Sequence, residues 1–411
     1  MDHSTRRIAF FFGVVIFASP WSAGAQKEGF ASGGRGDLSS VGFERRVILA
    51  REEGRAGAYA IPKMIVTRAG TALIVLQDRM GGDWGKPITP LVMRSADRGR
   101  TWSRPERIGA PLDEGGRYHV KPTGIVEDAR AGRVFVFLSR SPIRNKAGQI
   151  VNERWFYTHL QRTWECGRAW FLASSDDDGV TWLAPVEITD QLRQRPHWQE
   201  WSPVHSGIQL QRGPHAGRLV VPVRCYCPDR DPSELDWTRQ TNSLIYSDDA
   251  GATWHGAERT VPQVGECSIA ELSDGAIYVN QRAAPGSPKQ WRLFAISRDG
   301  GVTFAQRGEH DGLRDVKCHA GLAAARDPQG RHVLLFSNVP GPGGRRGLTI
   351  RASAADGRTW GEAKIVEPGN AAYSDLAVAK DGTILCVYES GKNSRKDISL
   401  ARLTWDWLYR H

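Results

Sequence analysis

One octapeptide recurs five times along the chain, first as Ser95-Ala-Asp97-Arg-Gly99-Arg-Thr101-Trp102. The later copies occupy 175–182, 247–254, 297–304 and 353–360. Ser and Asp side chains can hydrogen-bond nearby backbone groups, glycine tolerates a positive φ, and the final aromatic residue returns to a strand. Each copy therefore predicts a tight turn between β-strands, and we expect its aspartate to build the turn. Catalysis and metal binding are the less favoured roles for these aspartates.

The spacing of the copies, about 50 to 80 residues, predicts the fold. Units of that length made of a few antiparallel strands are typical of β-propeller blades. Residues 45–411 divided by about 60 residues per blade predict an all-β, six-bladed β-propeller. The apolar segment Ile398–Leu408 predicts a strand that closes the ring with the beginning of the chain. A ligand site is expected at the central axis, where the inner strands converge.

Composition and charge narrow the class of ligand. Hydrophobic residues make up 40% of the 411 residues and charged residues 24%, which excludes disorder, collagen and a polytopic membrane protein. The net charge of +10 is scattered rather than concentrated, so an acidic sugar or a polyanionic glycan fits better than nucleic acid. The sequence contains no P-loop, nucleotide fingerprint or spacing typical of a metal site, so we expect neither a cofactor nor a metal.

The N-terminal segment has the features of an export signal. Arginines precede the apolar run Ile8–Ala18, and Ala23–Ala25 supplies a small-x-small cleavage site. This run is shorter than the ~20 residues that a membrane-spanning helix needs. We therefore expect a signal peptide at 1–25, a flexible leader at 26–44, a secreted or periplasmic protein and no membrane span.

Six cysteines are too few to form the scaffold of a chain this long. No CxxC pair occurs among them, so the sequence favours buried free thiols. The residues are Cys166, Cys225, Cys227, Cys267, Cys318 and Cys386.

Five further motifs lie around the octapeptides in a fixed order. They are Tyr59-Ala60-Ile61-Pro62, the segment 206–222, the segment from Glu266 to Arg282, the segment 337–349, and the segment from Tyr373 to Glu389. With these motifs, the chain resembles the sialidase (neuraminidase) family over residues 45–411, and the octapeptide is similar to that family's Asp-box. The resemblance implies an exo-α-sialidase, a glycoside hydrolase that removes terminal α-linked sialic acids from glycans with retention of configuration.

The resemblance also implies three catalytic residues. Tyr373 corresponds to the nucleophile, and Glu266 to the base that removes its proton. A tyrosine suits this reaction because the carboxylate of sialic acid would repel a carboxylate nucleophile. A phenol with a reference pKa of ~10 needs a base at neutral pH. Asp83 corresponds to the general acid that protonates the leaving oxygen and later activates water.

Three arginines bind the sugar carboxylate in the family, and this chain keeps two of them. Arg282 matches the second position and Arg345 the third, with Arg346 as the alternative for the third. The first position is occupied by Ala60, which is a departure from the family pattern.

Glu389 matches the residue that holds the first arginine in the family. A buried carboxylate without a cation is costly, so another cation should replace that arginine. Lys63 and Arg55 are the nearest candidates in the sequence.

The departure at Ala60 keeps two other functions open. One is a glycosidase of the same fold that acts on another acidic 2-keto sugar. The other is a non-catalytic glycan-binding propeller, which has no need of Tyr373, Glu266 and Asp83. The sequence leaves the linkage preference, the balance between hydrolase and transferase, and the oligomeric state open.

Overall fold

The computed structural model describes most of the chain between residues 42 and 410. The described ranges are 42–52, 56–82, 85–109, 111–152, 167–194, 199–226, 241–258, 264–283, 290–314, 316–341, 343–391 and 397–410. The predicted signal peptide at 1–25 and nearly all of the predicted leader at 26–44 lie outside these ranges.

The described residues form five antiparallel sheets, which confirms the all-β fold class. The first sheet contains β2 (Ala58–Val66), β3 (Ala72–Arg79), β4 (Ile88–Ser95) and β5 (Glu106–Arg107). The second contains β6 (Tyr118–Asp128), β7 (Arg133–Pro142), β8 (Ala169–Ser175) and β9 (Val186–Glu187), and the 3-10 helix η1 (Glu114–Gly116) precedes it. The third contains β10 (Arg193–Gln194), β11 (Gln199–Pro203), β12 (Ile208–Gln209), β13 (Leu219–Tyr226), β14 (Thr241–Ser247) and β15 (His255–Gly256).

The remaining two sheets complete the molecule. The fourth contains β16 (Val264–Glu271), β17 (Ile277–Ala283), β18 (Trp291–Ser297) and β19 (Gln306–Arg314). The fifth has seven strands: β20 (Gly321–Arg326), β21 (His332–Asn338), β22 (Arg346–Ser353), β23 (Lys364–Val378), β24 (Ile384–Ser390), β25 (Asp397–Leu403) and β1 (Phe43–Leu49). The long strand β23 pairs with β22 through its first part and with β24 through its second part.

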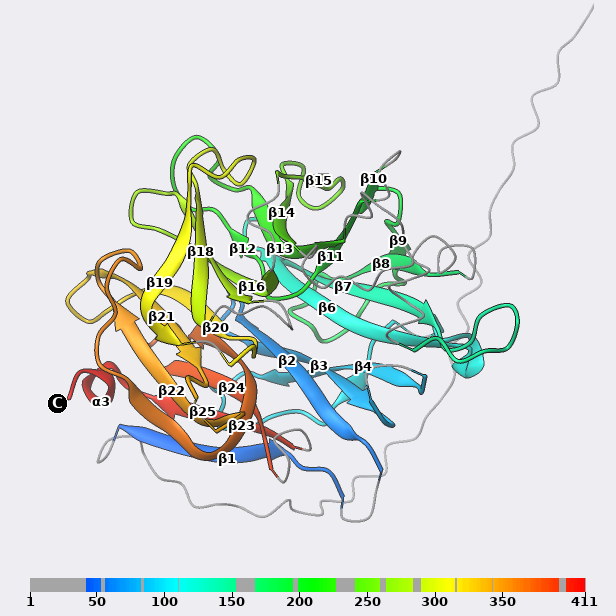
Figure 1. The fold of residues 1–411 in the computed structure, drawn as a ribbon, viewed down its shortest axis with the longest axis horizontal. Helices are drawn as coiled ribbons and strands as arrows, with labels where there is room; N and C mark the ends of the chain where they lie inside the picture. Colours follow the sequence, from blue (N-terminus) through cyan, green and yellow to red (C-terminus); the bar gives the residue numbers. More distant parts are fainter. Residues whose placement is uncertain are drawn as a thin grey trace, which may run out of the picture.

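The sheets follow one another in chain order around a common centre, in a propeller-like arrangement (Figure 1). Apolar clusters fill the space between consecutive sheets. One cluster joins Ile74 of β3 to Leu385 of β24, and another joins Val136 of β7 to Val75 of β3. Burying these side chains against neighbouring sheets supplies the main driving force for closing the arrangement.

The two ends of the described chain meet in the last sheet. β1 pairs antiparallel with β25, as the sequence predicts for the beginning of the chain. The predicted strand Ile398–Leu408 is wrong in its second half, because β25 ends at Leu403 and α3 (Trp405–Tyr409) follows. Thr404 explains the change: its side chain accepts a hydrogen bond from the Trp407 N–H and caps the helix.

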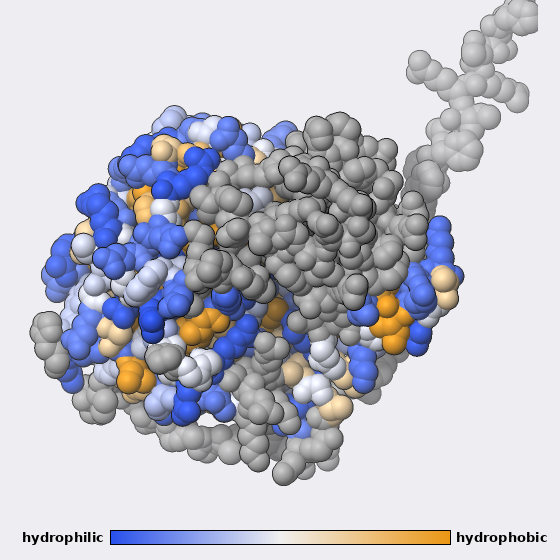
Figure 2. Space-filling model, viewed as in Figure 1, coloured by the Kyte–Doolittle hydropathy of each residue, from blue (hydrophilic) through white to orange (hydrophobic). Residues whose placement is uncertain are grey.

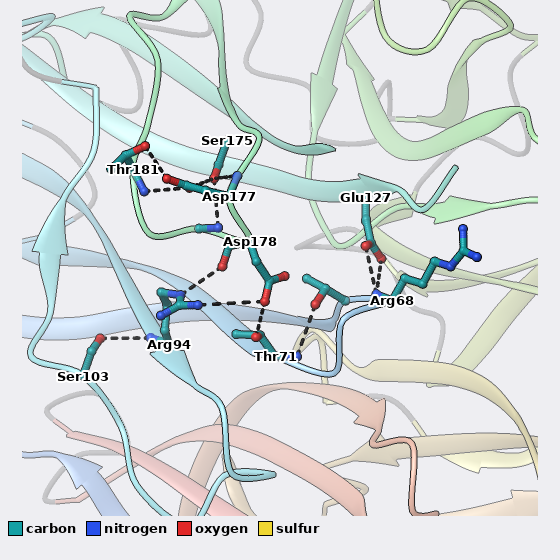
Figure 3. Close-up of polar contacts among 11 residues, drawn as sticks. Arg68, Thr71, Arg94, Ser103, Glu127, Ser175, Asp177, Asp178 and Thr181 are labelled. Atoms are coloured by element: carbon teal, nitrogen blue, oxygen red, sulfur yellow. Dashed lines mark hydrogen bonds and ion pairs between the residues drawn. The ribbon is translucent and has the colours of Figure 1, made fainter. Parts of the chain in front are cut away.

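The octapeptides form the predicted turns. In the second copy, Ser175 Oγ donates to Asp177 Oδ1 at 2.8 Å and accepts from Gly179 N at 2.8 Å. Asp177 Oδ1 accepts from Thr181 N at 2.8 Å, and Figure 3 shows these bonds together. Asp178 and Gly179 both have positive φ, at 62° and 79°. The same side-chain bonds recur in the first, third and fourth copies, so these aspartates serve the turn.

Each octapeptide also touches a neighbouring sheet. Asp178 contacts Thr71, which directly precedes β3, and Arg94 of β4, whose Nε donates to Asp178 O at 2.9 Å (Figure 3). A Cβ on Gly179 would lie 2.8 Å from Leu73 Cδ2, and one on Gly251 would lie 2.6 Å from Phe135 Cζ. The octapeptide glycine is therefore needed both for its backbone conformation and for close packing between sheets.

Replacing Gly179 by Ala should destabilise the protein more than the same change at Gly132. Both residues have positive φ, at 79° and 70°, but a Cβ on Gly132 meets nothing within 4 Å. Gly132→Ala should cost about 1–2 kcal/mol from backbone strain, and Gly179→Ala should cost about 1–3 kcal/mol more because its Cβ overpacks against Leu73. Urea unfolding measures both values. Equal losses of unfolding free energy in the two variants would show that close packing of Gly179 against Leu73 does not contribute to stability.

Hydrophobic residues are largely confined to the space between sheets. On the face shown in Figure 2, they form small patches among hydrophilic residues. None of the helices in the described part of the chain has the length and apolarity to span a membrane. Cys267, Cys318 and Cys386 are buried free thiols, as predicted. Cys225 is buried as well, whereas Cys166 and Cys227 lie outside the described residues.

Candidate active site

Strands of different sheets meet at the centre of the molecule, where β23 contacts β2 and β20, and β20 contacts β16. They carry the predicted site residues from distant parts of the chain. Glu266 lies on β16, Arg282 on the adjacent strand β17, and Tyr373 on β23. The ring topology therefore brings these three side chains together.

Tyr373, Glu266 and Arg282 form one hydrogen-bonded group. Tyr373 Oη donates to Glu266 Oε1 at 3.0 Å and accepts from Arg282 Nη1 at 3.2 Å. Arg282 Nε lies 2.5 Å from Glu266 Oε2, and both of these side chains are largely buried. A phenol held between a carboxylate and a guanidinium has both a proton acceptor and a stabilising positive charge next to its oxygen.

Burial and charge shift the two pKa values in opposite directions. Burial is the main cause that raises the pKa of Tyr373 well above its ordinary value, although Arg282 lowers it. Burial also acts to raise the pKa of Glu266, but the positive charges of Arg282 and Arg224 outweigh it, so this pKa is lowered. At neutral pH, the group therefore holds a neutral phenol beside an ionised carboxylate.

A backbone carbonyl holds the two predicted carboxylate-binding arginines together. Lys317 O accepts from Arg282 Nη1 at 2.9 Å and from Arg345 Nη2 at 3.3 Å. Arg345 Cζ also lies 5.2 Å from the centroid of the Tyr373 ring. Lys317 has a φ of 57°, a conformation uncommon outside glycine, which aims its carbonyl at this pair. Arg346, the alternative to Arg345, is exposed at the start of β22.

The segment around Ala60 lies against the predicted site residue Glu389. Glu389 is buried at 1% exposure, and its Oε1 accepts a hydrogen bond from the Ile61 backbone N at 2.8 Å. Ile61 has a φ of 51° within a β-bulge between Ala60 and Lys63. A positive φ is unfavourable for a β-branched residue, and such strain is concentrated at functional sites.

Two predicted residues fall outside the described part of the chain. Asp83, the proposed general acid, lies in the chain between β3 and β4, and Arg55 precedes β2. The described residues contain no group of three or more His, Cys, Asp or Glu side chains that could hold a metal ion.

Two histidines to which the sequence assigns no functional role lie next to Tyr373. The His319 ring stacks on the Tyr373 ring with centroids 5.9 Å apart, and the His205 ring lies 4.1 Å from that of His319. Burial lowers the pKa of His205 to about 3 and that of His319 well below its ordinary value, so both are neutral. His205 Nε2 lies 3.4 Å from Asp375 Oδ1. No motif marks these residues, because only the ring topology makes them neighbours.

Comparisons with known proteins agree with this fold. Residues 154–386 match the family model described as the BNR repeat-like domain. A sialidase from Micromonospora viridifaciens is 31% identical over 351 residues, which cover 83% of this chain and 52% of that protein. A sialidase from Bacteroides fragilis is 28% identical over 375 residues, which cover 86% of this chain and 64% of that protein.

The solved structure of the Hadza microbial sialidase Hz136 has the same fold. It superposes with a TM-score of 0.74 at 25% identity, over 88% of this chain and 68% of that one. The architecture and the octapeptide turns define an all-β, propeller-like protein of the Asp-box class. Within that class, the chain belongs to the sialidase family. It spans 52% and 64% of the length of the two bacterial relatives.

Proposed function

We propose that the chain is an exo-α-sialidase, a glycoside hydrolase that removes terminal α-linked sialic acids from glycoconjugates with retention of configuration. The observation that carries the proposal is the contact between Tyr373 Oη and Glu266 Oε1, with Arg282 bound to both side chains. A pure binding protein gains nothing from a buried tyrosine held against a carboxylate. The sialidases among the curated relatives support the same activity.

The reaction follows from the proton positions in this group. Glu266 accepts the Tyr373 proton as the phenol oxygen attacks the anomeric carbon, and Asp83 protonates the leaving glycosidic oxygen. Asp83 then removes a proton from water, which attacks the same carbon and releases Tyr373, and Glu266 returns the proton to the tyrosine. The two displacements retain the configuration, and Arg282 and Arg345 bind the substrate carboxylate.

The number of propeller blades is also part of the proposal. β23 pairs with β22 and then with β24, and an apolar cluster packs Leu335 of β21 against Cys386 of β24. We infer that the seven-stranded sheet is two blades that share β23, so that residues 45–411 form a six-bladed propeller. The signal peptide at 1–25 and a secreted or periplasmic location also remain proposals.

Release of 4-methylumbelliferone from a 4-methylumbelliferyl α-sialoside tests the activity. We expect turnover, with the α-anomer of free sialic acid as the first product seen by NMR. A well-folded protein that releases no fluorophore would contradict the sialidase proposal. Ala60 favours one second candidate, a glycosidase for another acidic 2-keto sugar, and umbelliferyl glycosides of such sugars test it in the same assay.

The acid limb of the pH profile should report on Glu266. Because the pKa of this carboxyl is lowered, kcat/KM should stay high as the pH falls and decline only below pH 4.5, the ordinary value for glutamate. The pKa of Tyr373 is raised, so this residue stays protonated across the range. Circular dichroism at each pH checks that the protein remains folded. A decline centred at pH 6 in folded protein would assign the base to another group.

A further inference from the structure

Lys63 is a buried positive charge that the proposed reaction does not yet use. It lies on β2 at 1% exposure, and its Nζ donates to Pro122 O at 3.2 Å and to Ile61 O at 3.5 Å. Burying an ammonium group is costly unless nearby groups stabilise its charge. A lysine kept at such a position needs a reason beyond packing.

The β-bulge in β2 places Lys63 on the same face as Ala60. Ala60 pairs with Gln77 of β3, and Lys63 pairs with Val75, with the register shift between them. Gln77 and Val75 are two residues apart on β3 and therefore share a face, so their partners do as well. Without the bulge, residues three apart would point to opposite faces.

The backbone of Ile61 connects Lys63 to Glu389. The Ile61 N–H donates to Glu389 Oε1 at 2.8 Å, while the Ile61 carbonyl accepts from Lys63 Nζ. Glu389 is the residue that, by resemblance, would hold the arginine missing at Ala60. The backbone N–H and C=O of this one residue, which belong to two consecutive peptide units, therefore bind the carboxylate and the ammonium group.

The charged groups that act on Lys63 include two glutamates of the candidate active site, Glu266 and Glu389. Burial lowers its pKa to about 8, while Asp375, Glu266 and Glu389 raise it. The lysine is therefore mainly protonated at pH 7, in the electrostatic field of both site glutamates. The charged and titratable groups that face it are Asp375 of β23, Glu266 of β16, Glu389 of β24, Arg79 of β3, His205 and His319.

We propose that Lys63 supplies the third positive charge of the carboxylate-binding site, in place of the side chain that Ala60 lacks. This inference rests on the proposed sialidase function and assigns a specificity-determining residue to it. A lysine is a point charge without the bidentate fork of arginine, and unlike arginine it loses its charge in mildly alkaline solution. Binding of the acidic sugar should therefore weaken as Lys63 deprotonates.

The test is the affinity for 2,3-dehydro-2-deoxy-N-acetylneuraminic acid, a non-hydrolysable sialic acid analogue, measured by calorimetry between pH 6.5 and pH 9.5. Wild-type affinity should fall as the pH rises through about 8. Lys63→Arg should lack this fall, because arginine stays charged. Burial raises the pKa of Asp375 to about 7, and the charge at position 63 lowers it, so the difference between the profiles reports the charge of the residue at position 63 together with its effect on Asp375.

Lys63→Met provides the second arm. Methionine preserves bulk, so at pH 7 this variant should fold, lose affinity by at least about tenfold and raise KM more than it lowers kcat. Lys380→Met, at an exposed lysine, is the matched control and should match the wild type. Unchanged affinity in Lys63→Met, or parallel pH profiles for wild type and Lys63→Arg, would overturn the role of Lys63 alone. A wild-type protein that neither binds the analogue nor cleaves a sialoside would overturn the proposed function and this inference with it.

Discussion

Tyr373→Phe should lower kcat for a 4-methylumbelliferyl α-sialoside by about 10³-fold or more. The change removes the Tyr373 oxygen that donates to Glu266 and accepts from Arg282, and with it the atom that would attack the anomeric carbon. The phenyl ring can still stack on His319 and lie under Arg345, so the variant should fold normally. Steady-state kinetics measure the loss, and thermal unfolding checks the fold.

The matched control is Tyr278→Phe on β17. Tyr278 is also a buried tyrosine with a hydrogen-bonded hydroxyl, here to His310, but it lies in the cluster between the fourth and fifth sheets. This variant should lose some stability and keep kcat. A fluorinated sialosyl fluoride should also trap a covalent adduct on Tyr373, located by peptide mass spectrometry. An adduct on a carboxylate, or an active Tyr373→Phe protein, would refute the tyrosine mechanism.

Arg282→Lys should reduce kcat/KM by about 10² to 10³-fold. The guanidinium bonds Tyr373 Oη and Lys317 O and lies 2.5 Å from Glu266. Lysine keeps the charge but cannot make these contacts in one plane. We expect kcat to fall and KM to rise, because Arg282 is proposed both to contact Tyr373 and to bind the substrate carboxylate.

Arg298→Lys serves as the control for this substitution. Arg298 pairs with Asp274 at 2.7 Å, and its side chain is 53% exposed, so its replacement should change neither activity nor stability measurably. If Arg282→Lys retained wild-type kcat/KM, Arg282 would have no role in either the chemistry or the binding.

The sequence predicts features whose cause is local. The turn at Asp177 follows from side chains that bond backbone groups within four residues, so the repeat alone reveals it. The same logic fails at Thr404, where a helix cap interrupts an apolar strand pattern. The order of the motifs around the turns is enough to indicate Tyr373, Glu266 and Arg282, although it says nothing of their distances.

Contacts between distant segments cannot be read from the sequence. His319 stacks on Tyr373, and His205 contacts His319, only because the sheets form a ring. No local sequence feature predicts these contacts. The proposed role of Lys63 also depends on such contacts, whereas Arg55 lies outside the described residues. A bulge in β2 turns Lys63 to the face of Ala60, and that register is set by pairing with β3.

The sequence by itself determined the strand-and-turn repeat, the all-β class and the residue types at the centre, because each follows from short-range hydrogen bonding or from motif order. Only the tertiary structure decided which side chains meet. Tyr373 reaches Glu266 across the centre of the molecule, and Lys317 turns one carbonyl toward two arginines. Such contacts depend on packing between sheets and on register, which are properties of the whole ring and not of any one segment.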